Sequence, residues 1–231
     1  MSYKPQTTFT SLSDWIDKPS FKAIFLVLLS GTWLTTATAQ VQFPVAQPTP
    51  KVGEIAKYRT IDLWNNAELS TSQSELVEVT GERLITRFNT STNPELRTNN
   101  FNRSWNPCRS LRNSDKMVCD GSIKFPLQAG TQYEYKELPW ANGNGFTSMK
   151  CEVKGEEKLT LSAGAFDTVK VECAGFWTRK FDGSGTGRTS ETNWYAPTIA
   201  RVVKNQYVSL LSSGAPDIKT QTDLVEFIPA K

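Results

Sequence analysis

The stretch CEVKGEEKLTLSAGAFDTVKVEC, residues 151–173, begins and ends with cysteine and has small residues near its midpoint, at 162–164. Successive residues of a strand point to opposite faces, so residues of one parity share a face. On one face the pattern places Cys151, Val153, Leu159, Leu161, Val169, Val171 and Cys173. On the other it places Lys158, Thr160, Lys170 and Glu172. The alternation predicts a β-hairpin whose apolar side lies in a core and carries a Cys151–Cys173 disulfide.

The remaining cysteines, Cys108 and Cys119, flank residues 112–115, a turn-forming run of Arg, Asn, Ser and Asp. Four cysteines allow three pairings, and this spacing favours Cys108 with Cys119 across a second hairpin. The chain has no histidine and no C-x-x-C pair, which argues against zinc. A zinc site made from all four thiolates remains the alternative, although these spacings do not favour it.

Outward from this hairpin, most of the chain alternates apolar and polar residues in short runs separated by turn-formers. The expected strands are residues 55–64, 75–80, 83–89, 133–137, 147–161, 166–181, 188–195, 200–211 and 219–228. No run keeps a helical period, so we predict an all-β fold, an antiparallel β-sandwich or open β-barrel in one domain over residues 52–229. Residues 90–104 are poor in strand-forming residues and are expected to form a surface loop.

The N-terminal residues differ from this pattern. Lys18 and Lys22 precede an apolar run, residues 23–34, that is followed by Ala37-Thr38-Ala39. This order is typical of a secretory signal peptide, which we place at residues 1–39, with cleavage after Ala39. A retained membrane anchor is the alternative, but the apolar run is shorter than the roughly 20 residues that span a bilayer. Residues 40–51 contain three prolines and are expected to form an extended leader.

An exported protein meets an oxidising compartment, which favours disulfides and a periplasmic or secreted location. Without the three lysines and two aspartates of residues 1–39, the 26 basic and 23 acidic residues become 23 and 21, a net charge of +2. Basic residues are scattered among acidic ones and form no stripe, so we expect no nucleic-acid partner. After cleavage we expect no membrane-spanning segment.

The run FDGSGTGRT, residues 181–189, has three glycines at alternate positions. This spacing fits neither the P-loop nor the dinucleotide-binding fingerprint, both of which open a helix. Strand-forming residues follow instead, among them Thr192, Trp194 and Tyr195. We interpret the run as a turn between two strands.

The absence of histidine excludes histidine-based nucleophile activation and most transition-metal sites. We expect no metal and no cofactor, and no catalytic residue can be named. The alternative to a binding protein is a hydrolase or lyase of envelope polymers that uses paired carboxylates. The acids considered for such a pair are Glu134, Glu172, Asp167, Asp182 and Glu191.

Aromatic residues offer the other kind of candidate site. If exposed in a groove of the sheet, they would bind an apolar or glycan ligand through their ring faces. The candidates are Trp105, Trp177, Trp194 and Tyr195. The competing interpretation assigns them to the core and to strand pairing.

Several segments together resemble a family of exported bacterial proteins of unknown function. The matching segments are FPL at 125–127, AGAFDTVKVE at 163–172, WYAP at 194–197 and VVK at 202–204. In that family a similar AGxFdtvkVe strand precedes a WYaP turn and a final rvvK strand. The resemblance implies a bacterial envelope setting and a twisted antiparallel sheet, and it implies no activity. The leading hypothesis is a non-enzymatic periplasmic β-domain that binds an envelope protein or a small apolar or glycan ligand.

Overall fold

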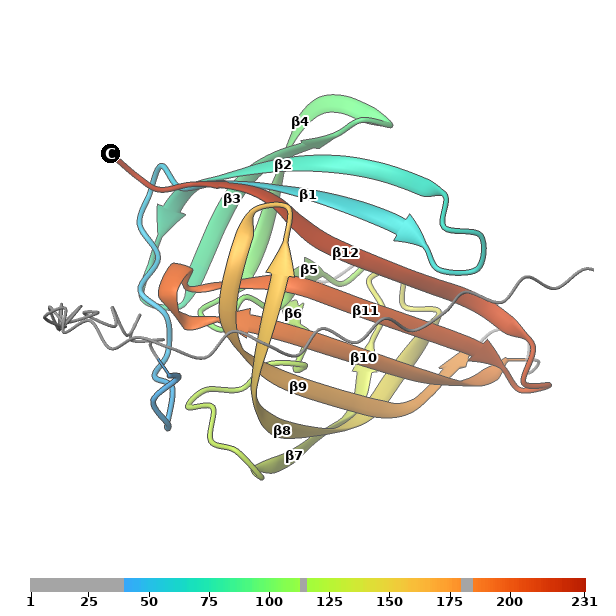
Figure 1. The fold of residues 1–231 in the computed structure, drawn as a ribbon. Helices are drawn as coiled ribbons and strands as arrows, with labels where there is room; N and C mark the ends of the chain where they lie inside the picture. The colour runs from blue at the N-terminus through green and yellow to red at the C-terminus, as the bar shows by residue number, and fades with distance from the viewer. Residues whose placement is uncertain (1–39, 113–115, 180–184) are drawn as a thin grey trace, which may run out of the picture. The chain divides into compact units, whose positions relative to one another are not determined.

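The computed structural model describes residues 40–112, 116–179 and 185–231, so the predicted signal peptide lies outside the described residues. Twelve strands form one antiparallel sheet in the order β6-β5-β4-β3-β2-β1-β12-β11-β10-β9-β8-β7 (Figure 1). The strands are β1 Ile55–Asp62, β2 Glu68–Val79, β3 Arg83–Thr90, β4 Asn93–Asn102, β5 Pro107–Ser110, β6 Met117–Cys119, β7 Gln132–Pro139, β8 Gly145–Leu161, β9 Gly164–Arg179, β10 Thr186–Ala196, β11 Arg201–Leu211 and β12 Pro216–Ile228. A short 3-10 turn, η1, covers Pro197–Ile199.

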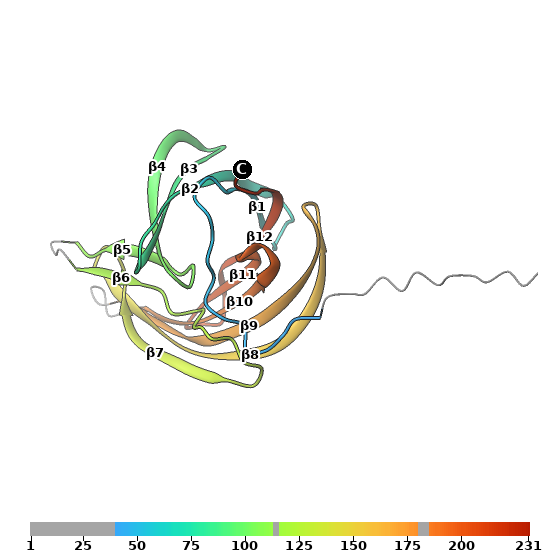
Figure 2. The same cartoon turned by 90° about the vertical axis from the view of Figure 1, so that its left-hand side faces the viewer.

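The sheet curls until its two edges, β6 and β7, face each other, so that it nearly closes into a barrel (Figure 2). Two hydrogen bonds link the regions of the two edges. The backbone N–H of Arg112 donates to the carbonyl of Ala141 over 2.9 Å. The hydroxyl of Tyr133 on β7 donates to the carbonyl of Ser122 over 2.9 Å. The predicted all-β antiparallel fold is confirmed, in its open-barrel form.

Both predicted disulfides are present, and each joins two residues that are directly opposite in neighbouring strands. Cys108 on β5 faces Cys119 on β6, and Cys151 on β8 faces Cys173 on β9. Cys151 and Cys173 are each 2% exposed, which places their sulfurs in the core as the alternation predicted. The expected turn residues 113–115 lie outside the described residues.

The shared face that was predicted for the 151–173 hairpin is wrong for Leu159 and Leu161, whereas Val169 and Val171 lie in the same cluster as Cys151 and Cys173 as predicted. The register of β8 against β9 shifts between Val153 and Gly155, and Gly155 has a φ of 120°, a left-handed value that glycine tolerates. One inserted residue turns all following side chains to the other face of the sheet. Leu159 and Leu161 therefore pack on the opposite side from Cys151.

This reversal gives the protein two apolar clusters. The larger one lies inside the curl and includes Leu76, Leu84, Val171 and the Cys151–Cys173 disulfide. In the smaller cluster, Leu159 and Phe166 of the β8–β9 hairpin tip pack with Trp194 and Leu224. In Figure 1 this tip crosses in front of β10 and β11 toward β12, and β8 contacts β12. The hairpin thus closes part of the outer face of the sheet.

The surface loop expected at residues 90–104 is wrong, because residues 93–102 form β4 and pair with β3. Most side chains of β4 are exposed and polar. Backbone hydrogen bonds hold this strand, so its sequence lacks the apolar alternation that marks a buried strand. This strand forms because it pairs with β3, and the pattern of its own residues does not predict it.

The two remaining expectations concern the leader and the glycine-rich run. Residues 40–51 contain no strand, but Val45 is buried and exchanges two backbone hydrogen bonds, of 2.8 and 2.9 Å, with Leu127. β10 begins at Thr186, opposite Thr178 of β9, so Gly187, the last glycine of the run, already lies in the strand. The expected strand is therefore present, while the turn at residues 180–184 lies outside the described residues.

Candidate functional site

A cavity of about 220 Å³ lies inside the curl, between β1–β3 and β11–β12. We call it the Trp105–Arg201 cavity. Its lining combines aromatic rings with hydroxyl, amide and guanidinium groups. The main lining residues are Tyr58, Ser74, Thr86, Phe101, Trp105, Arg201, Asn205 and Thr222. Because neighbouring strands deliver these residues to one concave face, no short segment of sequence contains the site.

Arg201, the first residue of β11, is the buried cation of the cavity, and Lys204 is a second cation in its lining. The side chain of Arg201 is 3% exposed and its Nη2 lies 3.3 Å from Oε2 of Glu54, whose side chain is 10% exposed. The guanidinium carbon lies 4.3 Å from the ring centre of Trp105 and 5.7 Å from that of Phe227. The carboxylate neutralises the guanidinium, and the rings hold its plane in place.

Three side-chain atoms of the cavity lining are buried and have no hydrogen-bond partner in the described residues. They are Oγ1 of Thr86, Nε1 of Trp105 and Nε of Arg201. Native proteins leave few buried polar groups unpaired, and each such group costs about 1–3 kcal/mol. All three carry a hydrogen to donate. The three residues line the same cavity, and a hydrogen-bond acceptor is the partner that these buried donors lack.

Tyr58 lies at the same cavity and donates its hydroxyl to the carbonyl of Val202 over 3.0 Å. Burial raises the pKa of the Tyr58 hydroxyl, although the nearby charge of Arg201 opposes the shift. The hydroxyl therefore stays protonated. Its role is to fix the wall of the cavity beside Arg201.

A second hollow, of about 340 Å³, lies where the two sheet edges approach each other. We call it the Trp140–Glu191 hollow. It is lined by Arg109, Asp120, Tyr135, Leu138, Trp140, Ala141, Thr147, Met149, Glu191 and Tyr207. A smaller space of about 210 Å³ shares Trp140, Thr147 and Tyr207 with it and adds Trp177, Arg179, Ser209, Asp217 and Ile218.

Glu191 is the acid at the inner wall of this hollow. Its Oε1 accepts hydrogen bonds from the side-chain amides of Asn193, over 3.1 Å, and Asn205, over 2.8 Å. Burial raises the pKa of Glu191, and the charge of nearby Asp120 acts in the same direction. Asp120 itself forms a bidentate ion pair with Arg109. Asn205 lines the Trp105–Arg201 cavity, so its hydrogen bond to Glu191 connects the linings of the two spaces.

The structure does not bring the four aromatic candidates together. Trp105 lines the Trp105–Arg201 cavity, and Trp177 lines the space beside Trp140. Trp194 is 5% exposed under the hairpin tip, with Lys204 4.9 Å and Lys170 5.5 Å from its ring centre. Tyr195 is 1% exposed in the larger cluster, where its ring meets that of Phe125 at 5.1 Å. Ligand binding therefore stays a prediction, tied to Trp105 and Trp177.

Sequence reasoning missed Thr86, Arg201 and Glu54. A signal existed for Thr86, since it stands at the same parity as Leu84 and Phe88 and so places a hydroxyl on an apolar face. No comparable signal marks the other two. Arg201 and Glu54 are separated by 147 positions and meet only because β1 and β11 both flank β12.

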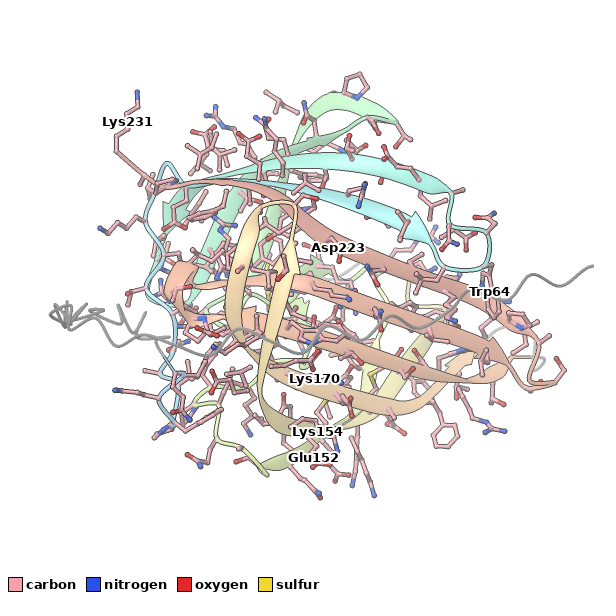
Figure 3. The ribbon with its side chains drawn as sticks, in the orientation of Figure 1. Trp64, Glu152, Lys154, Lys170, Asp223 and Lys231 are labelled. Carbon is pink, nitrogen blue, oxygen red and sulfur yellow. A yellow bond between two sulfur atoms is a disulfide. The ribbon has the colours of Figure 1, made fainter. Side chains whose placement is uncertain are left out.

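The acids considered for a catalytic pair lie mostly on the outer surface in ion pairs. Glu134 pairs with Lys136, and Asp167 with Lys158. Glu172 joins Lys170 and Lys154, and Figure 3 shows these two lysines near Glu152 on the β8–β9 hairpin. Asp182 lies outside the described residues. Glu134 and Glu172 line an open hollow of about 600 Å³ together with Glu152, and Glu191 lines the Trp140–Glu191 hollow together with Asp120. The hydrolase hypothesis therefore rests on these two groups of acids and stays a prediction.

Two further properties bear on the kind of site. In the described part of the chain, no three histidine, cysteine, aspartate or glutamate side chains gather as a metal site would require. The same residues contain no helix that is long and apolar enough to cross a bilayer.

Comparisons with known proteins identify a similar fold but indicate no activity. No protein-family model matches the chain, and no curated protein matches it. A solved structure described as a "putative lipoprotein" from Parabacteroides distasonis aligns with a TM-score of 0.51 and 12% identity, over 81% of this chain and 100% of the other. A "putative exported protein with YmcC-like fold" from Bacteroides fragilis aligns with a TM-score of 0.48 and 12% identity, over 80% of this chain and 99% of the other. At this identity, the likeness to the Parabacteroides protein shows a shared fold.

Proposed function

We propose that this protein is an exported, non-enzymatic β-domain that binds a small molecule in the Trp105–Arg201 cavity. The observation that carries the proposal is that three residues lining one cavity each keep a buried donor without a partner in the described residues. A ligand oxygen among Thr86, Trp105 and Arg201 would satisfy donors that the chain itself leaves unmatched. The rings of Tyr58 and Phe101 and the side chain of Val202 offer apolar surface to the body of a ligand, and the other lining residues are Ser72, Ser74, Lys204, Asn205 and Thr222.

The size of the cavity limits the ligand. An engineered cavity of about 150 Å³ binds benzene, and this one measures about 220 Å³. It therefore accepts a molecule somewhat larger than benzene, such as a substituted ring or a short acyl chain. Glu54 neutralises Arg201, and Lys204, the other cation of the lining, lies 4.9 Å from the ring centre of Trp194. We assign the acceptor to a neutral carbonyl or ether oxygen.

The two disulfides support a location outside the reducing cytoplasm. Together with the predicted signal peptide, they favour the periplasm or the extracellular space. In such a setting the two cross-links hold the free edge of the sheet and the centre of its inner core.

The test compares two probes of nearly equal shape, acetophenone and ethylbenzene, which differ by one carbonyl oxygen. We expect acetophenone to bind the wild-type protein more tightly in calorimetry and to raise its melting temperature, since ligands that bind the folded state stabilise it. Thr86→Val and Trp105→Phe each remove one donor and keep most of the side-chain volume. Each substitution should weaken acetophenone by about threefold to tenfold and leave ethylbenzene unchanged.

Thr189→Val is the matched control. Thr189 is equally buried, but its hydroxyl donates to the carbonyl of Val208 over 3.1 Å, far from the cavity lining. This variant should lose stability and keep its affinity for acetophenone, whereas Thr86→Val should keep its stability. Equal affinity of the wild-type protein for both probes, or no saturable binding of either, would reject the proposal.

A further inference from the structure

The Trp140–Glu191 hollow has the form of a site with an open mouth and a closed floor. Arg109 and Asp120 stand at the mouth, with side chains 30% and 25% exposed, and they come from β5 and the end of β6. Glu191 stands deeper, on β10, and is held by Asn193 and Asn205. Because β6 and β7 are the two sheet edges, the mouth lies at the gap where the curl stays open. A ligand can therefore enter without opening the sheet.

Two tryptophans form an aromatic wall here, and each packs over a glycine of a neighbouring strand. A Cβ on Gly145 would lie 2.6 Å from ring atoms of Trp140, and a Cβ on Gly187 would lie 2.3 Å from Cε2 of Trp177. The two rings are 6.2 Å apart with an angle of 46° between their planes. Glycine at these two positions is what allows both rings to lie close against the sheet.

The polar groups of the wall include donors and acceptors. Arg109 is a donor, while Asp120 and Glu191 are acceptors. In the adjoining space, Asp217 accepts a hydrogen bond of 3.0 Å from Ser209. Trp177 is 4% exposed, and its Nε1–H has no hydrogen-bond acceptor in the described residues. This unpaired donor is a separate indication that a ligand binds here.

These groups exclude two classes of ligand. An entirely apolar ligand would remove water from Arg109, Asp120 and Glu191 without replacing its hydrogen bonds, which is costly for charged groups. An anion would meet the acids Asp120 and Glu191 at short range. A neutral molecule with several hydroxyls fits, because each hydroxyl both donates and accepts. The apolar C–H face of a sugar ring also matches the face of an indole.

We propose that the Trp140–Glu191 hollow binds a neutral sugar unit, as a second site separate from the Trp105–Arg201 cavity. Hydroxyls of the sugar donate to Glu191 and Asp120 and accept from Arg109, and a hydroxyl that extends into the adjoining space accepts from Nε1 of Trp177. The ring of Trp140 covers the apolar face of the sugar. This site does not depend on what occupies the Trp105–Arg201 cavity, and either assignment can fail without the other.

The experiment titrates the wild-type protein with cellobiose, maltose and chitobiose, and follows the tryptophan indole N–H signals by nuclear magnetic resonance and the heat by calorimetry. Tetrahydropyran, a sugar-like ring without hydroxyls, is the probe control. We expect saturable binding of at least one disaccharide and none of tetrahydropyran. Trp177→Phe, which keeps the ring stacking and removes the unpaired N–H, should weaken that disaccharide by about tenfold.

Glu191→Gln tests the floor of the hollow with a side chain of the same shape and should also weaken the sugar. Phe176→Ala is the control, because Phe176 is the neighbour of Trp177 on β9 but is 63% exposed and lies outside the lining. It should bind like the wild-type protein. The proposal is overturned if no named disaccharide binds the folded wild-type protein, or if Trp177→Phe and Glu191→Gln both keep full affinity.

Discussion

The side-chain amide of Asn205 donates to the carboxylate of Glu191 over 2.8 Å, and it also donates to the amide oxygen of Asn193 over 2.8 Å. Asn205 lines the Trp105–Arg201 cavity, and Glu191 lines the Trp140–Glu191 hollow. The wall between the two spaces is therefore a hydrogen-bonded polar pair rather than packed apolar side chains. The charge of Glu191 is held inside the curl by these amides.

Glu191 should make the stability of the protein depend on pH. Burial raises the pKa of Glu191 in the folded state above the ordinary value of 4.5 for a glutamate. Between the unfolded and the folded pKa the folded state binds more protons, so the free energy of unfolding falls as pH rises through that window. Glu191→Gln should remove this fall, as measured by urea denaturation at a series of pH values from 4 upward.

The control for this series is Glu226→Gln, whose carboxylate is half exposed beside Lys57. The free energy of unfolding of this variant should fall with rising pH as it does in the wild-type protein. If Glu191→Gln and wild-type protein show the same slope against pH, the carboxyl of Glu191 is not desolvated as described.

Gly187→Ala should strongly destabilise the protein. A Cβ at this position would lie 2.1 Å from the carbonyl oxygen of Leu210 and 2.3 Å from Trp177, so backbone and ring would both have to move. Overpacking of this kind costs about 3 kcal/mol. Gly81→Ala is the matched control, because nothing lies within 4 Å of its Cβ, and it should be close to neutral in thermal denaturation. Equal melting temperatures of the two variants would contradict the packing of Trp177 over β10.

Glu54→Ala should cost about 3–5 kcal/mol, because it leaves the buried guanidinium of Arg201 without its carboxylate. Glu75→Ala removes a partner at a similar distance, 3.0 Å from Arg87, but both side chains are substantially exposed. That change should cost at most about 1 kcal/mol. Urea denaturation of both variants measures the difference, and comparable losses would mean that the Arg201 charge is solvated after all.

The two disulfides should contribute unequally. Cys151→Ala with Cys173→Ala removes a cross-link, worth about 2–5 kcal/mol, and also leaves a void in the inner cluster. Cys108→Ala with Cys119→Ala removes a half-buried cross-link at the edge of the sheet. We expect the first pair to lower the urea midpoint more. Peptide mapping under non-reducing conditions checks the pairing itself, and free thiols at 151 and 173 would contradict it.

Strands that bury one face could be predicted from the alternation of their own residues. β8 and β9 alternate apolar and polar side chains around the cysteines, and the parity of Cys151 and Cys173 predicted a core disulfide that the structure confirms. β4 has no such alternation, and it was missed because pairing with β3 holds its backbone while its side chains stay in solvent. The bulge at Gly155 was missed for a related reason. A single glycine occurs in strands for several structural reasons. Only the register of β8 against β9 shows that the bulge at Gly155 turns Leu159 to the other face.

For the candidate sites, the sequence identified Trp105 and Trp177 as aromatic candidates but gave no reason to separate them from Trp194 and Tyr195. Trp194 and Tyr195 are adjacent in β10, so they point to opposite faces, and neither borders a described cavity. Thr86, Arg201 and Glu191 could be recognised only once the strands that carry them were arranged around shared spaces.

By itself the sequence determined the class of fold, the two cross-links and the apolar face of most strands. These follow from the two-residue repeat of a strand and from cysteine chemistry, both of which act over short stretches of chain. The tertiary structure alone decided how far the sheet curls, which polar residues meet inside it and which donors are left without acceptors. These depend on contacts between residues as distant as Glu54 and Arg201, whose meeting is set by the order of strands in the sheet.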